Sequence, residues 1–270
     1  MKESRYIVDT TLRDGEQSPG VAFSKQDKIE IAKLLDAAQV YQIEAGIPAM
    51  GGIEKETIIE IKALCKNSLI STWNRINKQD IRHSFDCQPD IIHISVPVSD
   101  AQIYEKLQKD KIWLKENMRA CVDFARAHGY QVTVGFEDAS RADLNFLLEL
   151  AGCLKSYEVL YLRFADTVGI LTPFRTAEKV KAIIETTGIN IEFHAHNDLG
   201  MAVANSIAAA KAGAKFIDTT LGGIGERTGN CDFVKFIYTA QQLYDLSMDL
   251  ASASVAAESV TNKLKVQNDM

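Results

Sequence analysis

The hydrophobic residues of this 270-residue chain form short apolar runs that alternate with longer amphipathic stretches. Short apolar runs bounded by turn residues are typical of strands in a parallel sheet that is covered on both faces. We predict eight strands, at Tyr6–Thr10, Val40–Ala45, Leu69–Trp73, Ile91–Val96, Gln131–Phe136, Val159–Phe164, Asn190–His194 and Phe216–Thr219.

The stretches between these runs carry hydrophobic residues at helical spacing. In Lys25–Ala38, the residues Ile31, Leu34, Leu35 and Ala38 lie on one helical face. We predict further helices at Ile53–Cys65, Ile103–His128, Arg141–Leu154, Phe174–Thr186, Met201–Ala212 and Asp232–Tyr244. Alternating strands and helices indicate a parallel sheet with right-handed crossovers. Eight such units without a long linker predict closure into an α/β fold of the (β/α)8 TIM-barrel type.

The domain organisation follows from the same pattern. Proline is rare and no low-complexity segment interrupts the alternation, so we expect one catalytic barrel domain over residues 1–246. The remaining residues, 247–270, are rich in alanine and serine and carry no strand signal. We expect them to form a short C-terminal helical tail.

Composition narrows the class of protein. The net charge is −6, and acidic and basic residues are mixed along the chain without a basic patch. Nucleic acid is therefore not an expected partner. The five cysteines are scattered and form no CxxC pair, which is typical of reduced thiols in the cytoplasm. No apolar run approaches the roughly 20 residues of a membrane span, and no signal peptide is evident. We therefore expect a cytoplasmic protein without a membrane partner.

Polar residues gather where the predicted strands end. In a TIM barrel the active site lies at the carboxyl ends of the strands. The polar residues at these positions are Arg13, Asp14, Glu44, Arg75, Asn77, Glu137, Asp138, Asp166, Thr167, His194, His196, Asn197, Glu226, Arg227 and Asn230. Other histidines and aromatic residues, including His93 and Trp73, show no such pattern, and we interpret Trp73 as a core residue.

His194 and His196 give the sharpest chemical signal. Residues two apart on a strand point to the same side, and the apolar residues between them point to the other. We therefore expect both imidazoles to face the barrel interior, where they either hydrogen-bond to neighbours or bind a metal ion. With Asp14 and water they suit an octahedral ion with nitrogen and oxygen ligands, and Mg²⁺, Mn²⁺ and Zn²⁺ all stay open.

Arg13 and Asp14 follow the first strand directly. The pair could be a simple ion pair in a turn. Alternatively, the carboxylate of Asp14 could bind the metal while the guanidinium of Arg13 binds a substrate oxygen, for which its planar fork of donors is well suited. Glu44, at the end of the second strand, could hold Arg13 in place.

Three segments carry a family resemblance. DTTLRDGEQ, HAHND and GGIGERTGN resemble the α-isopropylmalate synthase and homocitrate synthase family, whose relatives include hydroxymethylglutaryl-CoA lyase. The resemblance covers essentially the whole barrel. HISVPVSD, EDASRADL and RFADTVGILTPF look most like nitrogenase-associated homocitrate synthases.

The resemblance implies roles for individual residues. It implies that Asp14, His194 and His196 bind a divalent cation, with Asn230 as a fourth ligand or close neighbour. The implied catalytic residues are Arg13 at the keto oxygen, Glu44 orienting it, and Glu137 near the reacting centre. The implied substrate-binding residues are Gln17 lining the site, Thr167 at the carboxylate of the oxo acid, and Arg75 and Asn77 near its distal end.

The implied reaction is a Claisen condensation of acetyl-CoA with 2-oxoglutarate, which gives homocitrate and CoA. A 2-isopropylmalate- or citramalate-type synthase, a related lyase, and a non-catalytic barrel subunit of a full-length paralogue are the alternatives. Family synthases continue beyond the barrel into subdomains that supply a histidine base, whereas this sequence ends at Met270. We therefore expect a homo-oligomer, or a hetero-oligomer with a subunit that carries those subdomains.

Overall fold

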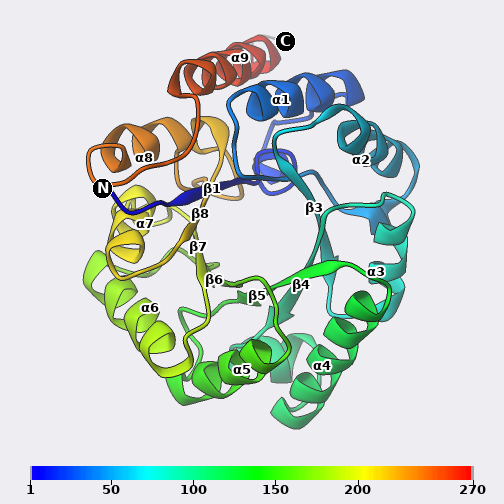
Figure 1. Ribbon diagram of the computed structural model, residues 1–270, viewed down its shortest axis with the longest axis vertical. Helices are drawn as coiled ribbons and strands as arrows, with labels where there is room; N and C mark the ends of the chain where they lie inside the picture. Colours follow the sequence, from blue (N-terminus) through cyan, green and yellow to red (C-terminus); the bar gives the residue numbers. More distant parts are fainter. Residues whose placement is uncertain (1, 269–270) are drawn as a thin grey trace.

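The computed structural model describes residues 2–268 and shows one closed barrel (Figure 1). Each strand pairs in parallel with its neighbours in chain order, and the last strand pairs with the first, Tyr6 opposite Phe216. The strands are β1 (Tyr6–Asp9), β2 (Gln42–Glu44), β3 (Leu69–Arg75), β4 (Ile91–Pro97), β5 (Gln131–Glu137), β6 (Leu162–Asp166), β7 (Ile191–Ala195) and β8 (Phe216–Thr219). The predicted (β/α)8 barrel is confirmed.

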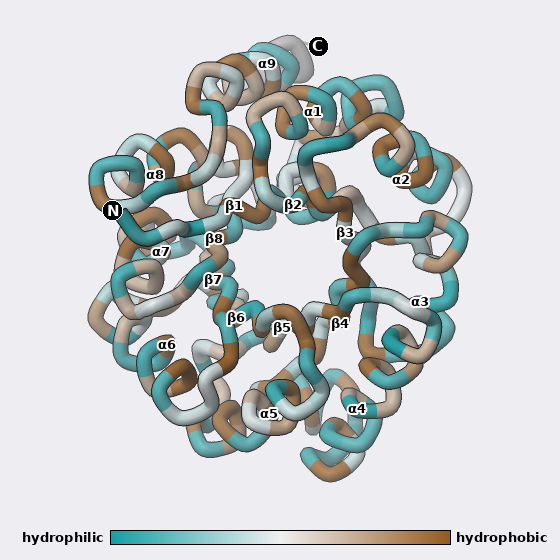
Figure 2. The backbone as a smooth tube through the Cα atoms, viewed as in Figure 1, coloured by the Kyte–Doolittle hydropathy of each residue, from teal (hydrophilic) through white to brown (hydrophobic). Residues whose placement is uncertain are grey.

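Helices surround the barrel, and hydrophobic and hydrophilic residues alternate along them, as Figure 2 shows. This alternation lets each helix bury one face against the strands. The α-helices are α1 (Lys25–Ala37), α2 (Gly52–Leu64), α3 (Lys78–Phe85), α4 (Lys111–Ala127), α5 (Leu144–Ser156), α6 (Pro173–Thr187), α7 (Ala202–Lys211), α8 (Phe233–Ala240) and α9 (Leu250–Asn268). Short 3-10 or π-helical turns are η1 (Gly15–Gln17), η2 (Pro48–Met50), η3 (Ala101–Lys106) and η4 (Leu221–Gly223).

Two helix predictions were wrong. No helix was expected between the third and fourth strands, yet α3 forms there. Its eight residues contain only two large hydrophobic ones, Ile81 and Phe85, which are too few to mark a helix in the sequence. The predicted helix Ile103–His128 is two elements, the π-helix η3 and the α-helix α4. The break contains Gln108 with a left-handed φ of 53°, and Asp110 caps α4 by accepting the N–H of Trp113.

The last described helix, α9, lies beside α1 on the outside of the barrel (Figure 1). Lys263 ties the two helices together through Asp27, 2.7 Å away, and Glu30, 3.1 Å away. The expected tail over 247–270 therefore contains a helix, although residues 269–270 lie outside the described part of the chain. The domain boundary at residue 246 stays a prediction.

The barrel interior changes from aromatic to charged along its axis. At one level Tyr6, Tyr41, Tyr161 and Phe216 stack with ring centroids 4.2–5.4 Å apart. Arg163 lies on β6, two residues after Tyr161, and its guanidinium reaches three carboxylates in the barrel interior. These are Glu44 at 2.8 Å, Glu192 at 2.8 Å and Asp218 at 3.6 Å. This layer forms the floor below the carboxyl ends of the strands.

The five cysteines are free thiols, as the sequence predicted. Four are buried, and burial raises the pKa of Cys65 and Cys231 to about 12. A high thiol pKa keeps the unreactive protonated form dominant. Among residues 2–268, no helix is long and apolar enough to cross a membrane.

Candidate active site

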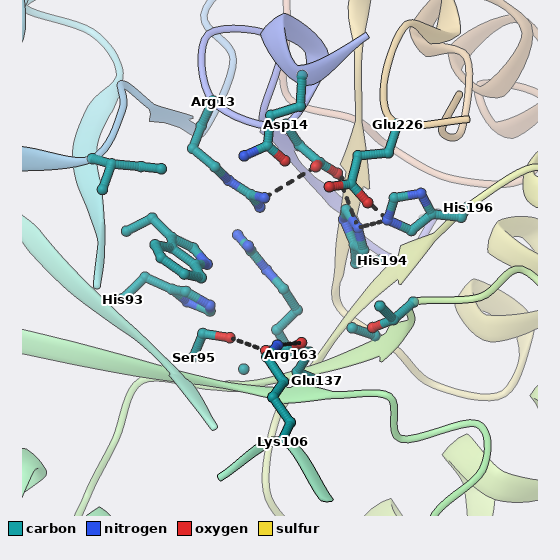
Figure 3. A pocket seen from close by; sticks show the side chains of 16 residues that line it. Arg13, Asp14, His93, Ser95, Lys106, Glu137, Arg163, His194, His196 and Glu226 are labelled. Atoms are coloured by element: carbon teal, nitrogen blue, oxygen red, sulfur yellow. Dashed lines mark hydrogen bonds and ion pairs between the residues drawn. The ribbon is translucent and has the colours of Figure 1, made fainter. Parts of the chain in front are cut away.

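A cavity of about 230 Å³ opens at the carboxyl ends of the strands (Figure 3). Its lining residues come from the barrel strands and from the loops that follow them. They are Arg13, Asp14, Gln17, Ile47, Trp73, His93, Ser95, Lys106, Gly135, Glu137, Arg163, Ala165, Thr167, His194, His196 and Glu226. Seven of the residues to which the resemblance gave a role therefore meet in one cavity: Arg13, Asp14, Gln17, Glu137, Thr167, His194 and His196.

Asp14, His194 and His196 converge in this cavity and could hold a metal ion. The two Nε2 atoms lie 3.1 Å apart, and Asp14 Oδ2 lies 3.2 Å from His194 Nε2 and 3.6 Å from His196 Nε2. Ligands about 2.0–2.2 Å from an ion lie roughly 3 Å apart when they occupy neighbouring positions. The donor set and its spacing thus fit a divalent cation.

Backbone geometry places these three ligands. His194 lies on β7, and His196 follows it at the point where the chain bridges to Asn230. Asp14 is held by a turn in which its N–H donates to Thr10 O at 2.8 Å. Two strand ends that are distant in the sequence but close around the barrel therefore supply the ligands.

The contacts around His194 resemble those of a metal-bound histidine. Its Nδ1 lies 2.9 Å from Asp218 Oδ2, while its Nε2 faces Asp14. A carboxylate behind the distal ring nitrogen orients a metal-binding imidazole and raises its basicity. Burial opposes charge on this ring, but Asp218 and Asp14 raise the pKa of His194 to about 10. Burial and the neighbouring His194 lower the pKa of His196 to about 4.

Asn230 lies behind Asp14. Its Nδ2 donates to Asp14 Oδ2 at 2.7 Å, and its buried Oδ1 has no hydrogen-bond partner among the described residues. The side chain packs so closely under Gly225 that a Cβ atom there would lie 2.8 Å from it. Asn230 is therefore placed to orient Asp14, and its free oxygen points to a cation as the missing partner.

We predict that metal binding releases a proton from His194. The pKa of about 10 means that this ring is protonated at neutral pH without metal, and the metal needs the same Nε2. Affinity should rise by about tenfold per pH unit between pH 6 and 8, since His196 is already neutral there. Calorimetry in two buffers of different ionisation enthalpy measures the released proton. A pH-independent affinity over this range would contradict the prediction.

Arg13 lies beside this centre and is almost fully enclosed. Its Nε donates to Glu44 Oε1 at 2.6 Å, its Nη1 lies 3.1 Å from Asp14 Oδ1, and its guanidinium lies 5.8 Å from the ring centroid of Trp73. Burial opposes charge, but Glu44 and Asp14 raise the pKa of Arg13 above its usual value. The side chain therefore presents a fixed positive charge next to the three ligands.

Glu137 and Thr167 line the wall across β5 and β6. Lys106 Nζ lies 2.9 Å from Glu137 Oε1, and Ser95 Oγ lies 3.5 Å from Glu137 Oε2. The hydroxyl of Thr167 accepts the N–H of Asp138 at 2.8 Å, so its own hydrogen can donate to a ligand in the cavity.

Arg75 and Asn77 are not in the cavity. The Arg75 side chain is 67% exposed and pairs with Asp80 through two hydrogen bonds of 2.6 and 3.1 Å. Asn77 caps α3 by accepting the N–H of Asp80. Arg75 is the last residue of β3, where its ion pair with Asp80 overrides the direction set by the strand's alternation, and Asn77 lies beyond the strand. The structure gives no support for their predicted contact with the substrate.

Six lining residues with polar or aromatic side chains escaped the sequence-derived site. Glu226 was singled out only as a polar loop residue, and the others are Trp73, His93, Ser95, Lys106 and Arg163. The alternation of β4 carries part of the missing signal, because His93 and Ser95 occupy every second position among apolar residues. Lys106 gives no such signal, since it lies on the π-helical turn η3.

A closed barrel whose cavity at the carboxyl ends of the strands brings together three side chains that could hold a metal ion is typical of a metal-dependent TIM-barrel enzyme. The chain belongs to the HMGL-like family, whose model matches residues 5–261.

Two relatives and one solved structure show what the chain is similar to. It is 54% identical to the homocitrate synthase subunit alpha of Clostridium pasteurianum over 88% of both chains. It is 47% identical to 2-isopropylmalate synthase 2 of Caldanaerobacter subterraneus, covering 91% of this chain and 64% of that protein. The fold matches the HMG-CoA lyase of Bacillus subtilis with a TM-score of 0.86 at 18% identity, over 97% of this chain and 94% of the lyase.

Proposed function

We propose that this protein is the barrel catalytic subunit of a homocitrate synthase. It would condense acetyl-CoA with 2-oxoglutarate, forming homocitrate and releasing CoA. The observation that carries the proposal is the Asp14, His194 and His196 centre with the Arg13 guanidinium beside it. The 54% identity to a homocitrate synthase subunit supports the choice of reaction.

The donor set suits a divalent ion, Mg²⁺ or Mn²⁺ first and Zn²⁺ as an alternative. When bound, such an ion supplies Lewis-acid polarisation of the ketone. Arg13 uses Nε and Nη1 on Glu44 and Asp14, which leaves Nη2 to donate to the keto oxygen. Glu44 holds this arginine in position. Thr167 donates its hydroxyl hydrogen to the carboxylate next to the ketone, and Gln17 borders the same space.

The condensation needs a base that removes a methyl proton from acetyl-CoA. The resulting carbanion forms the new C–C bond at the ketone carbon, and the keto oxygen becomes a hydroxyl by taking up a proton. Water then cleaves the thioester and CoA leaves as the thiol. Glu137 lies in the cavity and can donate or accept a proton near the reacting carbon.

We propose that a second subunit completes the site by supplying the base on acetyl-CoA. The similar protein from Clostridium pasteurianum is named as a subunit, and this chain spans 88% of its length. A homo-oligomer in which a neighbouring copy contributes is the alternative assembly.

Two other functions stay open. The 47% identity to a 2-isopropylmalate synthase favours a 2-isopropylmalate- or citramalate-type reaction with another oxo acid. A related lyase uses the same fold. A non-catalytic barrel that serves a full-length paralogue is disfavoured by the three converging metal-ligating side chains.

The test is a panel of 2-oxo acids with thiol release from acetyl-CoA as the readout. We expect 2-oxoglutarate to outperform 2-oxoisovalerate and pyruvate in the presence of Mg²⁺ or Mn²⁺. Adding a candidate second subunit should increase the rate. Preference for 2-oxoisovalerate or pyruvate would contradict the homocitrate assignment. Full activity of the purified chain alone would contradict the partner subunit.

A further inference from the structure

Arg227 lies in the glycine-rich loop after β8 and has a backbone conformation that is rare for its residue type. Its φ is 55°, in the left-handed region that favours glycine. Glycine would form the same turn without this steric cost, as it does at other positions of the loop. Neither the metal centre nor the proposed chemistry uses the Arg227 side chain. A strained backbone that carries a large polar side chain points to a function of that side chain.

The guanidinium of Arg227 joins three loops at the carboxyl ends of the strands. Its Nη2 donates to the backbone oxygen of Thr167, after β6, at 2.7 Å. Its Nε and Nη2 donate to the two carboxylate oxygens of Asp198, after β7, at 2.8 and 3.0 Å. Its Nη1 donates at 3.1 Å to Glu226, which lines the cavity (Figure 3). All three nitrogens are engaged by the protein, so the side chain connects these loops.

The carboxylate of Asp198 gives Arg227 a fixed partner. A Cβ atom at Gly169, in the loop after β6, would lie 2.5 Å from Asp198 Oδ2 and 2.8 Å from Asp198 N. These distances are shorter than such atoms can approach, so the two loops are in direct contact at this point. Asp198 therefore cannot shift toward the β6 loop, and the guanidinium bound to it is held at a set distance from Thr167.

Thr167 is held at two atoms. Arg227 binds its backbone oxygen, and its hydroxyl oxygen accepts the N–H of Asp138 at 2.8 Å. The hydroxyl hydrogen is then left to donate to a ligand in the cavity. Its direction depends on where the Thr167 peptide lies, and the Arg227 contact determines that position.

We propose that Arg227 is a positioning residue, which holds Thr167 where its hydroxyl meets the carboxylate next to the ketone of the oxo acid. This inference rests on the proposed function, from which it takes the role of Thr167. Arg227 does not line the cavity itself. The metal ligand His196 is held separately, because the chain there bridges to Asn230 through the backbone. Arg227 should therefore affect binding of the oxo acid and not binding of the metal ion.

The test is a double-mutant cycle on the full chain with Mn²⁺, in which calorimetry measures dissociation constants. 2-Oxoglutarate, 2-oxoisovalerate and pyruvate are compared, because each carries the carboxylate assigned to Thr167. Thr167→Val keeps the backbone oxygen and should weaken binding of the preferred acid by roughly 10- to 100-fold. Arg227→Gly should weaken it by roughly 10-fold. The double variant should bind within about twofold of Thr167→Val alone, since both changes act on one hydroxyl.

Two further variants complete the design. Arg227→Met keeps the length of the stem without its donors, carries the same expectation, and replaces the glycine variant if that one does not fold. The matched control is Glu158→Gly. Glu158 also has a left-handed φ, 52°, and an exposed ion pair with an arginine, Arg126 at 3.0 Å, but it lies outside the cavity. This control should leave the affinities for the acids and for Mn²⁺ unchanged.

Three results would overturn the proposal. Additive losses in the cycle would mean that Arg227 acts through another group, such as Glu226. Loss of Mn²⁺ affinity in the Arg227 variants would mean that the whole site had moved. Failure of all three acids to bind the unmodified protein would leave Thr167 without its ligand. If the protein prefers 2-oxoisovalerate or pyruvate and the cycle is still non-additive, the homocitrate assignment fails and the role of Arg227 stands.

Discussion

Replacing His194 or His196 by alanine is expected to abolish tight binding of a divalent metal ion, and turnover with it. Each variant removes one of three ligand atoms that lie 3.1–3.6 Å from one another. Loss of residues that merely support a ligand already costs about 10–100-fold in metal affinity, so loss of a ligand itself should exceed that. Calorimetry with Mn²⁺ and thiol release measure the two effects.

The variants should still fold, because both histidines lie at the open end of the barrel and not in its hydrophobic core. A cooperative melting transition checks this point. His83→Ala on α3, which is outside the cavity, is the matched control and should keep both metal binding and turnover. Full metal affinity in both active-site variants would refute the metal centre.

The convergence of His194 and His196 could be predicted because strand geometry is regular. Side chains alternate between the two faces of a strand, so the sequence alone predicts that His194 and His196 point inward together. The contacts agree with this direction. Inside the barrel, Glu192 pairs with Arg163 at 2.8 Å and His194 lies 2.9 Å from Asp218. Phe193, of the opposite parity, stacks with Phe164 at 5.9 Å.

The same regularity fails where strands end. Arg75 has the inward parity of β3, but an acidic neighbour on α3 draws its guanidinium outward. Asn77 lies past the strand and serves as a helix cap instead. Neither outcome could be predicted, because α3 itself was not expected from a segment with only Ile81 and Phe85 as large hydrophobic residues.

His93 shows a different limit. Its alternation with isoleucines on β4 is visible in the sequence, but a single inward histidine is usually a satisfied core residue. What leaves room for its ring at the cavity wall is Gly135 on the neighbouring strand, and that depends on the register between β4 and β5. Pairwise register between strands about 40 residues apart in the sequence is set by closure of the barrel, which a single sequence does not reveal.

Replacing Arg13 by lysine is expected to keep the positive charge and lose most turnover. The guanidinium engages Glu44 at 2.6 Å and Asp14 at 3.1 Å through two different nitrogens, and a third is left for the keto oxygen. Lysine has one nitrogen on a flexible stem, so a carboxylate would capture it and the oxygen contact would be lost. Loss of one such donor typically costs about 10²–10³ in rate.

The decisive measurement is kcat with acetyl-CoA and 2-oxoglutarate, made beside the metal dissociation constant. Metal affinity should change little, because Arg13 donates to Asp14 Oδ1 while the histidines face Oδ2. Arg82→Lys, an exposed residue on α3, is the control and should retain both properties. Near-normal turnover of Arg13→Lys would exclude the keto-oxygen role. A parallel loss of metal binding would instead mean that Arg13 acts by positioning Asp14. The contact of Arg13 with Oδ1 would then also fix Oδ2, which faces the histidines.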